Sequence, residues 1–279
     1  MQPTSSIVNI TPGLAEEMLK CNNSNFRPLD QSRVLRYAKE MERGNWVMNG
    51  QGIVFDATGE LVDGQTRLAA IVKSGMTIQM LVVRGVGDVS MTVDRGKPRQ
   101  LSQWLRHKGM KNATSMAAVS RLVLSHDRGL WRNKSFKSYD IVDSEIISFC
   151  EANEDELYSA IRLGARSQGL MVGSIAAAIY FIGSGGSPSA SETAEWFSDK
   201  LQTGKGLVEE EPVYHFREWL ISFNKDIRPS ANAIRWTMTN AWNMTILGKT
   251  STTKRAIVLA LSGPRAQTPP NQVLVEGQI

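Results

Sequence analysis

The sequence has few of the side chains that form disulfides and zinc sites. Its 279 residues include only 2 cysteines and 3 histidines. Cys21 and Cys150 lie far apart, and the histidines do not have the spacing of metal ligands. We therefore expect reduced thiols in a cytoplasmic protein, with each histidine in a packing or surface role.

Long apolar runs and the common catalytic loops are missing as well. The longest apolar run, Ile175 to Ile182, is shorter than the roughly 20 residues that span a bilayer, and it predicts a short core helix. The N-terminus has no basic segment followed by an apolar run, so we expect no signal peptide. The sequence contains neither a Walker-type glycine-rich loop nor a nucleophile elbow.

The most informative stretch of the chain runs from Gly50 to Val83. Ile53 to Phe55 is rich in β-branched and aromatic residues and predicts a strand, and Leu61-Val62 predicts a second strand after a turn. A helical pattern follows almost at once and ends near Gly75. Apolar residues at positions i, i+3 and i+4 mark this helix: Leu68, Ile71 and Val72.

The junction between the second strand and this helix predicts an anion site. Asp63-Gly64 leads straight into the helix, so free N–H groups and the positive end of the helix dipole face solvent. Arg67 lies in the first turn, where a guanidinium can bind a phosphate through two hydrogen bonds. Asp63 could hold a metal ion or a sugar hydroxyl. The alternative is structural: Asp63 caps the helix and Arg67 is a solvated surface residue.

Positive charge is concentrated in one part of the sequence. Residues 84–137 contain twelve Lys or Arg against three Asp, and residues 138–161 contain seven acidic residues and no Lys or Arg. A basic segment beside a phosphate site is typical of nucleic-acid contact, although a solvated surface gives the same pattern. Trp104 and Trp131, in the same segment, could stack on a base or pack in the core. We expect DNA contacts from five cations: Lys97, Arg99, Arg106, Lys108 and Lys111.

The remaining sequence predicts an α+β fold. Before residue 110 the patterns predict a loose lead-in over 1–7, helices over 11–20, 30–43 and 101–109, and a strand over 91–94. Beyond residue 113 strand signals nearly vanish. Helical spacing or caps then mark residues 113–126, 140–152, 154–165, 171–182, 190–203, 212–223 and 230–246.

These elements group into two expected domains and a tail. Residues 1–105 should form a domain with a small mixed sheet. Residues 106–262 should form an all-helical domain. Residues 263–279 contain proline and glutamine, and we expect them to be a mobile tail.

The central motif resembles a known family signature. Asp63 to Leu68, with the sequence Asp-Gly-Gln-Thr-Arg-Leu, resembles the DGQ-x-R signature of the ParB/sulfiredoxin-like superfamily. The preceding segments agree in order: a helix, Gly44-Asn45-Trp46, a strand and an Asp-x-x-Gly turn. The chain looks most like the ParB-like proteins of bacteriophages and mobile elements, and the resemblance covers Ile10 to Arg99. It implies a nucleotide-binding domain over residues 1–105 and, for a phage-encoded protein, the cytoplasm of a bacterial host.

The resemblance also implies a role for each residue of the motif. Backbone N–H groups of Gly64, Gln65 and Thr66 would bind the phosphates of a nucleoside triphosphate, ATP or CTP. Arg67 would be the charged, catalytic clamp, and Asp63 a Mg²⁺ ligand or a base. Four residues from neighbouring segments would face or close the same pocket: Asn25, Arg27, Asp94 and Arg95.

The sequence departs from the family at three points. Thr66 stands where most members have histidine, so a reaction that needs an imidazole there is not implied. The double arginine of the CTP-binding partition proteins is missing, so nothing favours CTP in particular. The motif also lacks the cysteine of sulfiredoxin, so reduction of a sulfinic acid is not implied.

Two classes of function remain open. The first is an enzyme that binds a nucleotide and acts on or with DNA, as an NTPase, a nuclease or a phosphoryl-transfer enzyme with a divalent metal. The second is a DNA-binding or regulatory module that keeps the fold without catalysis. Candidate bases are scarce: Asp63, Glu60 and Asp94.

Overall fold

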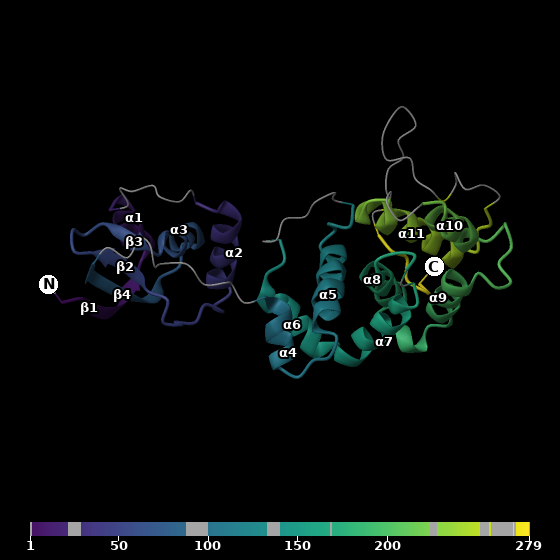
Figure 1. Cartoon of the computed structure of the whole chain (residues 1–279), viewed down its shortest axis with the longest axis horizontal. Coiled ribbons are helices and arrows are strands. Elements are labelled where there is room, and N and C mark those ends of the chain that lie inside the picture. Colours follow the sequence, from purple (N-terminus) through teal and green to yellow (C-terminus); the bar gives the residue numbers. More distant parts are fainter. Residues whose placement is uncertain are drawn as a thin grey trace, which may run out of the picture. The chain divides into compact units, whose positions relative to one another are not determined.

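The protein consists of two compact units (Figure 1). The computed structural model describes residues 2–21, 29–87, 100–132, 140–167, 169–223, 228–251, 257, 270 and 272–278. Unit 1 comprises Met1–Pro98 and Lys137–Ser144, and unit 2 comprises Arg99–Phe136 and Glu145–Ile279. Unit 2 therefore begins before the domain boundary expected at residue 105, which would cut helix α4 (Leu101–His107).

Unit 1 contains a small mixed sheet. Its strands are β1 (Thr4–Ile10), β2 (Ile53–Asp56), β3 (Leu61–Asp63) and β4 (Ile78–Val86). They lie in the order β1-β4-β2-β3, with β2 parallel to β4 and the other two pairs antiparallel. Buried and partly exposed residues alternate along β2, as expected for a sheet that is packed on one face.

Three helices form the core of unit 1 together with the sheet. They are α1 (Pro12–Lys20), α2 (Gln31–Glu42) and α3 (Gln65–Ser74). Thr11 and Asp30 cap α1 and α2 through their side-chain oxygens, as their sequence positions predicted. Leu68 and Ile71 of α3 are fully buried in this core, which anchors the helix that follows the DGQ-x-R motif.

The loose lead-in expected over residues 1–7 is wrong for residues 4–7. These residues belong to β1, which pairs with β4 in continuous antiparallel register from Thr4↔Arg84 to Ile10↔Ile78. The partner strand lies far along the sequence, so local pattern could not reveal the pairing. The strand expected over 91–94 lies outside the described residues.

All secondary-structure elements of unit 2 within its described residues are helices. Besides α4 it contains α5 (Ala113–Asp127), α6 (Asp143–Ala152), α7 (Glu154–Ala165), α8 (Gly173–Gly183), η1 (Pro188–Ala190), α9 (Glu192–Thr203), α10 (Pro212–Ile221) and α11 (Ala231–Ile246). Residues 143 and 144 of α6 are grouped with unit 1. These helices confirm the predicted ones, and the fold is α+β. None of the helices in the described ranges is long and apolar enough to cross a membrane.

Helix α8 and two tryptophans form the centre of unit 2. Every residue of α8 from Ile175 to Gly183 is buried. A Cβ on Gly183 would lie 2.3 Å from the Trp242 ring, so this position needs glycine for close packing. Trp131 is fully buried and its Nε1 donates to Thr239 Oγ1 at 3.1 Å, so Trp131 packs in the core and does not stack on a base.

The sequence predicts a state for the two cysteines and for the C-terminal stretch. Cys21 and Cys150 are both free, which agrees with the expected reduced thiols. The expected mobile tail is, over residues 272–278, bound to the helices of unit 2. His126 and Asn243 accept hydrogen bonds from the backbone of this stretch.

Candidate functional site

Gly64 allows β3 to turn directly into α3. Its φ is +108°, in the left-handed region that favours glycine. A Cβ at this position would lie 2.6 Å from Ile53 Cδ1 and 3.1 Å from Ile53 Cα. Both the backbone conformation and the lack of space therefore require glycine at the start of this helix.

The N-terminus of α3 has no side-chain cap. Gly64 is the N-cap residue, and its carbonyl accepts from Leu68 N at 3.0 Å. Among the residues that the structure describes, no acceptor takes a hydrogen bond from the N–H groups of Gln65, Thr66 and Arg67. These groups and the helix dipole together form an electropositive surface that suits an anion. Asp63 is not the N-cap, so the capping role considered for it does not hold.

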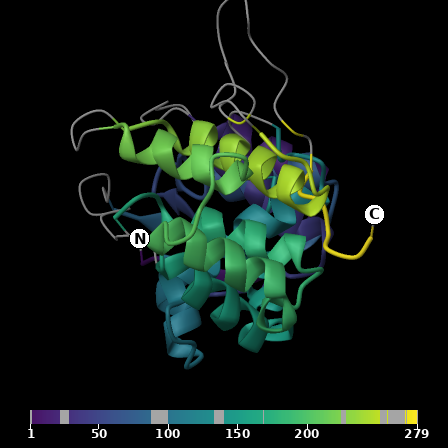
Figure 2. The same ribbon diagram turned by 90° about the vertical axis from the view of Figure 1, so that its right-hand side faces the viewer.

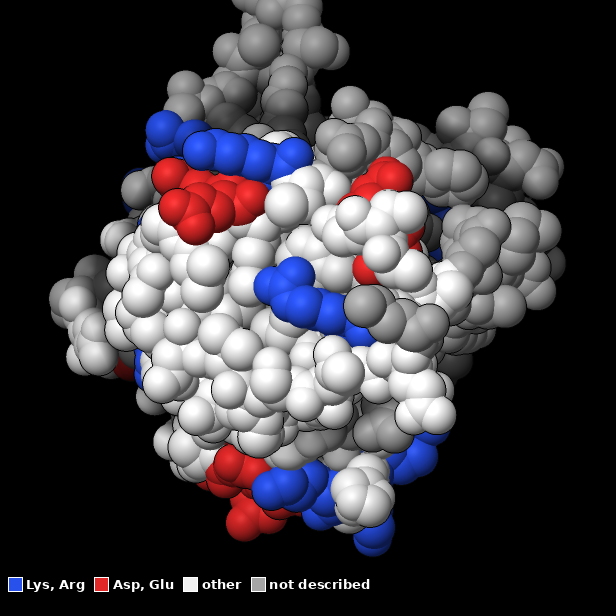
Figure 3. Space-filling view, turned by 90° about the vertical axis from the view of Figure 1, so that its left-hand side faces the viewer, with Lys and Arg blue, Asp and Glu red and all other residues white. Residues whose placement is uncertain are grey.

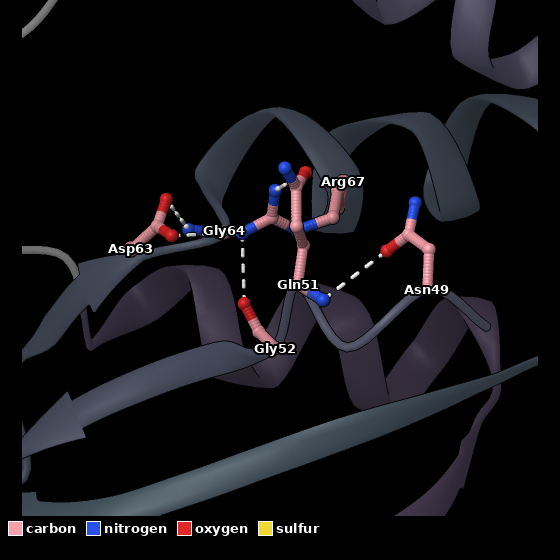
Figure 4. A network of polar contacts seen from close by, with 6 residues as sticks. All are labelled: Asn49, Gln51, Gly52, Asp63, Gly64 and Arg67. Atoms are coloured by element: carbon pink, nitrogen blue, oxygen red, sulfur yellow. Dashed lines mark hydrogen bonds and ion pairs between the residues drawn. The ribbon is translucent and has the colours of Figure 1, made fainter. Parts of the chain in front are cut away.

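Arg67 points inward, beside the helix start (Figure 4). Its Nη2 donates to Gly52 O at 2.8 Å and to Asp63 Oδ2 at 2.9 Å. Its Nη1 donates to Gln51 Oε1 over a longer 3.4 Å. The side chain is 11% exposed, so Arg67 is not the solvated surface residue of the structural alternative. It ties the start of β2 to the end of β3.

The Asp63 carboxylate uses both of its oxygens inside the site. Oδ1 accepts from Gly64 N at 2.6 Å, and Oδ2 accepts from Arg67 Nη2. The side chain remains 30% exposed. Within the described ranges no group of three or more His, Cys, Asp or Glu could hold a metal ion. A Mg²⁺ ion at Asp63 would therefore need the oxygens of a bound phosphate as further ligands.

Three residues before β2 complete the site and were not predicted. Gln51 and the carbonyl of Gly52 accept from Arg67, and Asn49 Oδ1 accepts from Gln51 N at 3.1 Å (Figure 4). A Cβ on Gly52 would lie 2.8 Å from the Leu81 carbonyl oxygen, so glycine lets this segment approach β4. The signal was visible in the sequence as the closely spaced glycines of Asn49-Gly50-Gln51-Gly52.

The structure brings together the motif residues Asp63 to Arg67. The other expected pocket residues, and two of the five expected DNA-binding cations, lie outside the described residues: Asn25, Arg27, Asp94, Arg95, Lys97 and Arg99. The remaining three cations, Arg106, Lys108 and Lys111, are exposed at the end of α4 and in the turn after it.

The basic segment forms ion pairs with the acidic segment that follows it in the sequence. Lys108 Nζ lies 3.4 Å from Glu151 Oε1, and the Arg128 guanidinium pairs with the Glu145 carboxylate. The acidic block of the sequence thus folds against the basic block, which lowers the net positive field. On the side of β1 that Figure 3 shows, Lys and Arg side chains are separated by uncharged and acidic ones.

Neither the protein-family models, nor the curated proteins, nor the solved structures include a match to this chain. The chemistry of the site is therefore the basis for a function. That chemistry is an uncapped helix start, a buried arginine and a carboxylate, placed within one strand-turn-helix.

Proposed function

We propose that this chain is a ParB-like protein of phage or mobile-element type that binds the phosphates of a nucleoside triphosphate at the start of α3. The observation that carries the proposal is the uncapped N-terminus behind Gly64, where three backbone N–H groups lack an acceptor in the described part of the chain. A phosphate would satisfy these groups and interact favourably with the helix dipole. The resemblance of residues 63–68 to the DGQ-x-R signature supports a nucleotide as its source.

Arg67 would supply positive charge without a large rearrangement. Its contacts to Gly52 O and Asp63 hold Nη2, whereas the one partner of Nη1 among the described residues is Gln51, at 3.4 Å. A phosphate oxygen can replace Gln51 at Nη1, and the exchange substitutes a charge-assisted hydrogen bond for a weak neutral one. In this binding mode Gln51 is displaced while the remainder of the site stays in place.

Binding without turnover is the version of the proposal that the Asp63 contacts favour. Its two oxygens accept from Gly64 N and Arg67 Nη2, and these contacts hold the carboxylate at the start of α3 as a structural partner of Arg67. The second candidate is an NTPase or nuclease in which the nucleotide and Mg²⁺ pull Asp63 away from Arg67. Release of inorganic phosphate from ATP, absent in Asp63→Asn, would establish the NTPase, and cleavage of DNA that the same substitution abolishes would establish the nuclease.

The proposed action with DNA rests on the exposed cations that follow α4. Arg106 and Lys111 project from unit 2, whereas Lys108 is paired with Glu151. Charge reversal at Arg106 and Lys111 should weaken DNA binding at low salt. Unchanged affinity in this double variant would remove DNA from the proposal and leave the nucleotide site untouched.

A charge introduced at Thr66 separates phosphate binding from fold stability. Thr66→Glu places a carboxylate in the first turn of α3, which should stabilise the helix by about 0.5 kcal/mol and repel phosphate. We expect ATP with Mg²⁺ to raise the Tm of the wild-type chain but not that of Thr66→Glu, and Thr66→Gln to behave like the wild type. A thermal-shift titration with ATP and CTP, with and without Mg²⁺, measures this.

Arg67→Ala should lose the nucleotide-induced shift as well. Lys73→Ala removes an exposed cation from the last turn of the same helix and is the matched control. Because Arg67 is also structural, the quantity compared is the shift on adding nucleotide and not the Tm itself. A full nucleotide shift in both Thr66→Glu and Arg67→Ala would contradict the proposed site.

A further inference from the structure

The end of the chain lies on unit 2 as an extended segment. We call residues 272–278 the strap; in Figure 2 it is the yellow stretch that runs beside α11. Gln272, Gly277 and Gln278 are exposed, whereas Val273 is only 3% exposed. The strap therefore rests on the surface and inserts one side chain, as a bound peptide does.

Helix side chains hold the strap by its backbone. Asn243 donates to Gln272 O at 3.0 Å and accepts from Leu274 N at 2.8 Å, so one amide binds both groups of the peptide backbone. Trp242 Nε1 donates to Leu274 O at 2.9 Å, and His126 Nε2 accepts from Val273 N at 3.0 Å. These contacts bind backbone N–H and C=O groups of the strap, so they place no requirement on most of its side chains.

A carboxylate fixes the other end of the strap. Glu276 N donates to Gly183 O at 2.7 Å, and the Glu276 carboxylate accepts from the hydroxyls of Ser191 and Thr193. Ser191 is the N-cap of α9, so the carboxylate lies at the positive end of that helix. The helices of unit 2 thus contact two side chains of the pattern Val-x-x-Glu, a buried valine and an acid three residues later.

We propose that the surface formed by α8, α9, α11 and His126 is a peptide-binding groove, and that the strap of a second copy of this chain is its partner. The strap occupies the groove of its own chain as a built-in ligand. The same residues from another copy offer the same backbone, valine and carboxylate, so they can replace it without any change in the groove. Exchange of straps would join two chains, with each copy contributing residues to the groove of the other.

Peptide binding to a chain with a weakened strap tests the groove. Val273→Asp in the full chain removes the buried anchor and leaves every groove residue intact. A fluorescent peptide with the sequence of residues 270–279 should bind this variant roughly tenfold or more tightly than the wild type, whose groove is occupied. Gln278→Asp adds the same charge at an exposed strap position and should bind the peptide as weakly as the wild type.

Two further controls test the specificity of peptide binding and the folding of the strap variant. A peptide with Asp for Val273 and Lys for Glu276 should not bind, and adding Asn243→Leu to the Val273→Asp chain should abolish peptide binding. If Val273→Asp does not unfold cooperatively, Glu276→Lys replaces it, because it disturbs the strap at a partly exposed position. If a folded strap variant binds the peptide no better than the wild type does, the proposal of a peptide-binding groove is wrong.

Mixing two variants tests the second copy as partner. Asn243→Leu keeps a normal strap but has a damaged groove, and Val273→Asp keeps a normal groove but has a damaged strap. Each alone should have the mass of a single chain, and the mixture should contain a species of twice that mass by light scattering. A mixture that stays at the mass of one chain, under conditions where the peptide binds, overturns the second copy as the partner.

Discussion

The two units build their polar sites in opposite ways. In unit 1, Asp63 and Arg67 are four residues apart and meet because α3 begins between them. In unit 2, the strap reaches residues that are distant in sequence, such as His126, 147 positions from Val273. The contact between Asp63 and Arg67 can form as soon as its strand-turn-helix forms, whereas the strap depends on the assembled helices.

The largest expected effect is the loss of stability caused by a substitution at Gly64, in the turn between β3 and α3. Gly64→Ala forces a Cβ against Ile53 in a left-handed backbone, and should destabilise unit 1 by about 3 kcal/mol. Hydrogen exchange should rise across residues 61–74 and stay unchanged in unit 2. Gly59→Ala is the control, because Gly59 has φ +86° but open space around it, so only backbone strain is added. Equal losses in the two variants would show that the contact with Ile53 is unimportant.

A smaller effect tests the long-range site through pH. Burial lowers the pKa of His126 below its usual value of 6.5, although Asp127 beside the ring raises it in part. The neutral ring accepts from Val273 N, a hydrogen bond worth about 1 kcal/mol. Because the folded-state pKa is the lower one, this stability is fully present above pH 6.5 and is lost as the pH falls through the folded-state pKa.

Hydrogen exchange of the Val273 and Leu274 amides measures this release of the strap. Their protection, corrected for the intrinsic pH dependence of exchange, should decrease on acidification in the wild type. In His126→Gln the decrease should disappear, while the amides of α3 in unit 1 should show no such step in either protein. A wild-type strap that stays equally protected below the folded-state pKa would mean that His126 does not hold it.

The smallest expected effect concerns the ion pair between Lys108 of the basic segment and Glu151 of the acidic segment. Lys108 and Glu151 are both exposed, so their ion pair should contribute no more than about 0.5 kcal/mol to unit 2. A double-mutant cycle with Lys108→Ala and Glu151→Ala measures the coupling by urea unfolding. A coupling above about 1 kcal/mol would show that the two blocks stabilise unit 2 by charge and not only by packing.

The sequence predicted what is local in this molecule. The turn at Gly64, the helix that ends at Gly75 and the caps at Thr11 and Asp30 all depend on residues a few positions apart, and the structure has each of them. The motif Asp63 to Arg67 was located for the same reason. The side to which Arg67 turns was not predicted, because its partners Gln51 and Gly52 belong to another segment.

What the sequence did not predict depends on distant partners. Residues 1–7 looked like a loose lead-in, since Thr4 to Ile7 form part of a strand only through pairing with β4. The strap looked like a mobile tail, since Asn243 and Trp242 are the groups that hold it. The separation of charge along the sequence suggested a basic surface, but Lys108 meets Glu151 once the helices pack.

The edge position of β1 has a practical consequence for work with this protein. β1 pairs with β4 from Ile78 to Arg84, and β4 would become the outer strand of the sheet without it. The new edge would present unpaired N–H and C=O groups beside Leu81 and Val83, which are only partly buried. Such an edge is a template for intermolecular pairing. Chains that start at residue 11 and so lack β1 should therefore aggregate. An N-terminal affinity tag should be separated from Thr4 by a spacer, so that it does not disturb the pairing of β1 with β4.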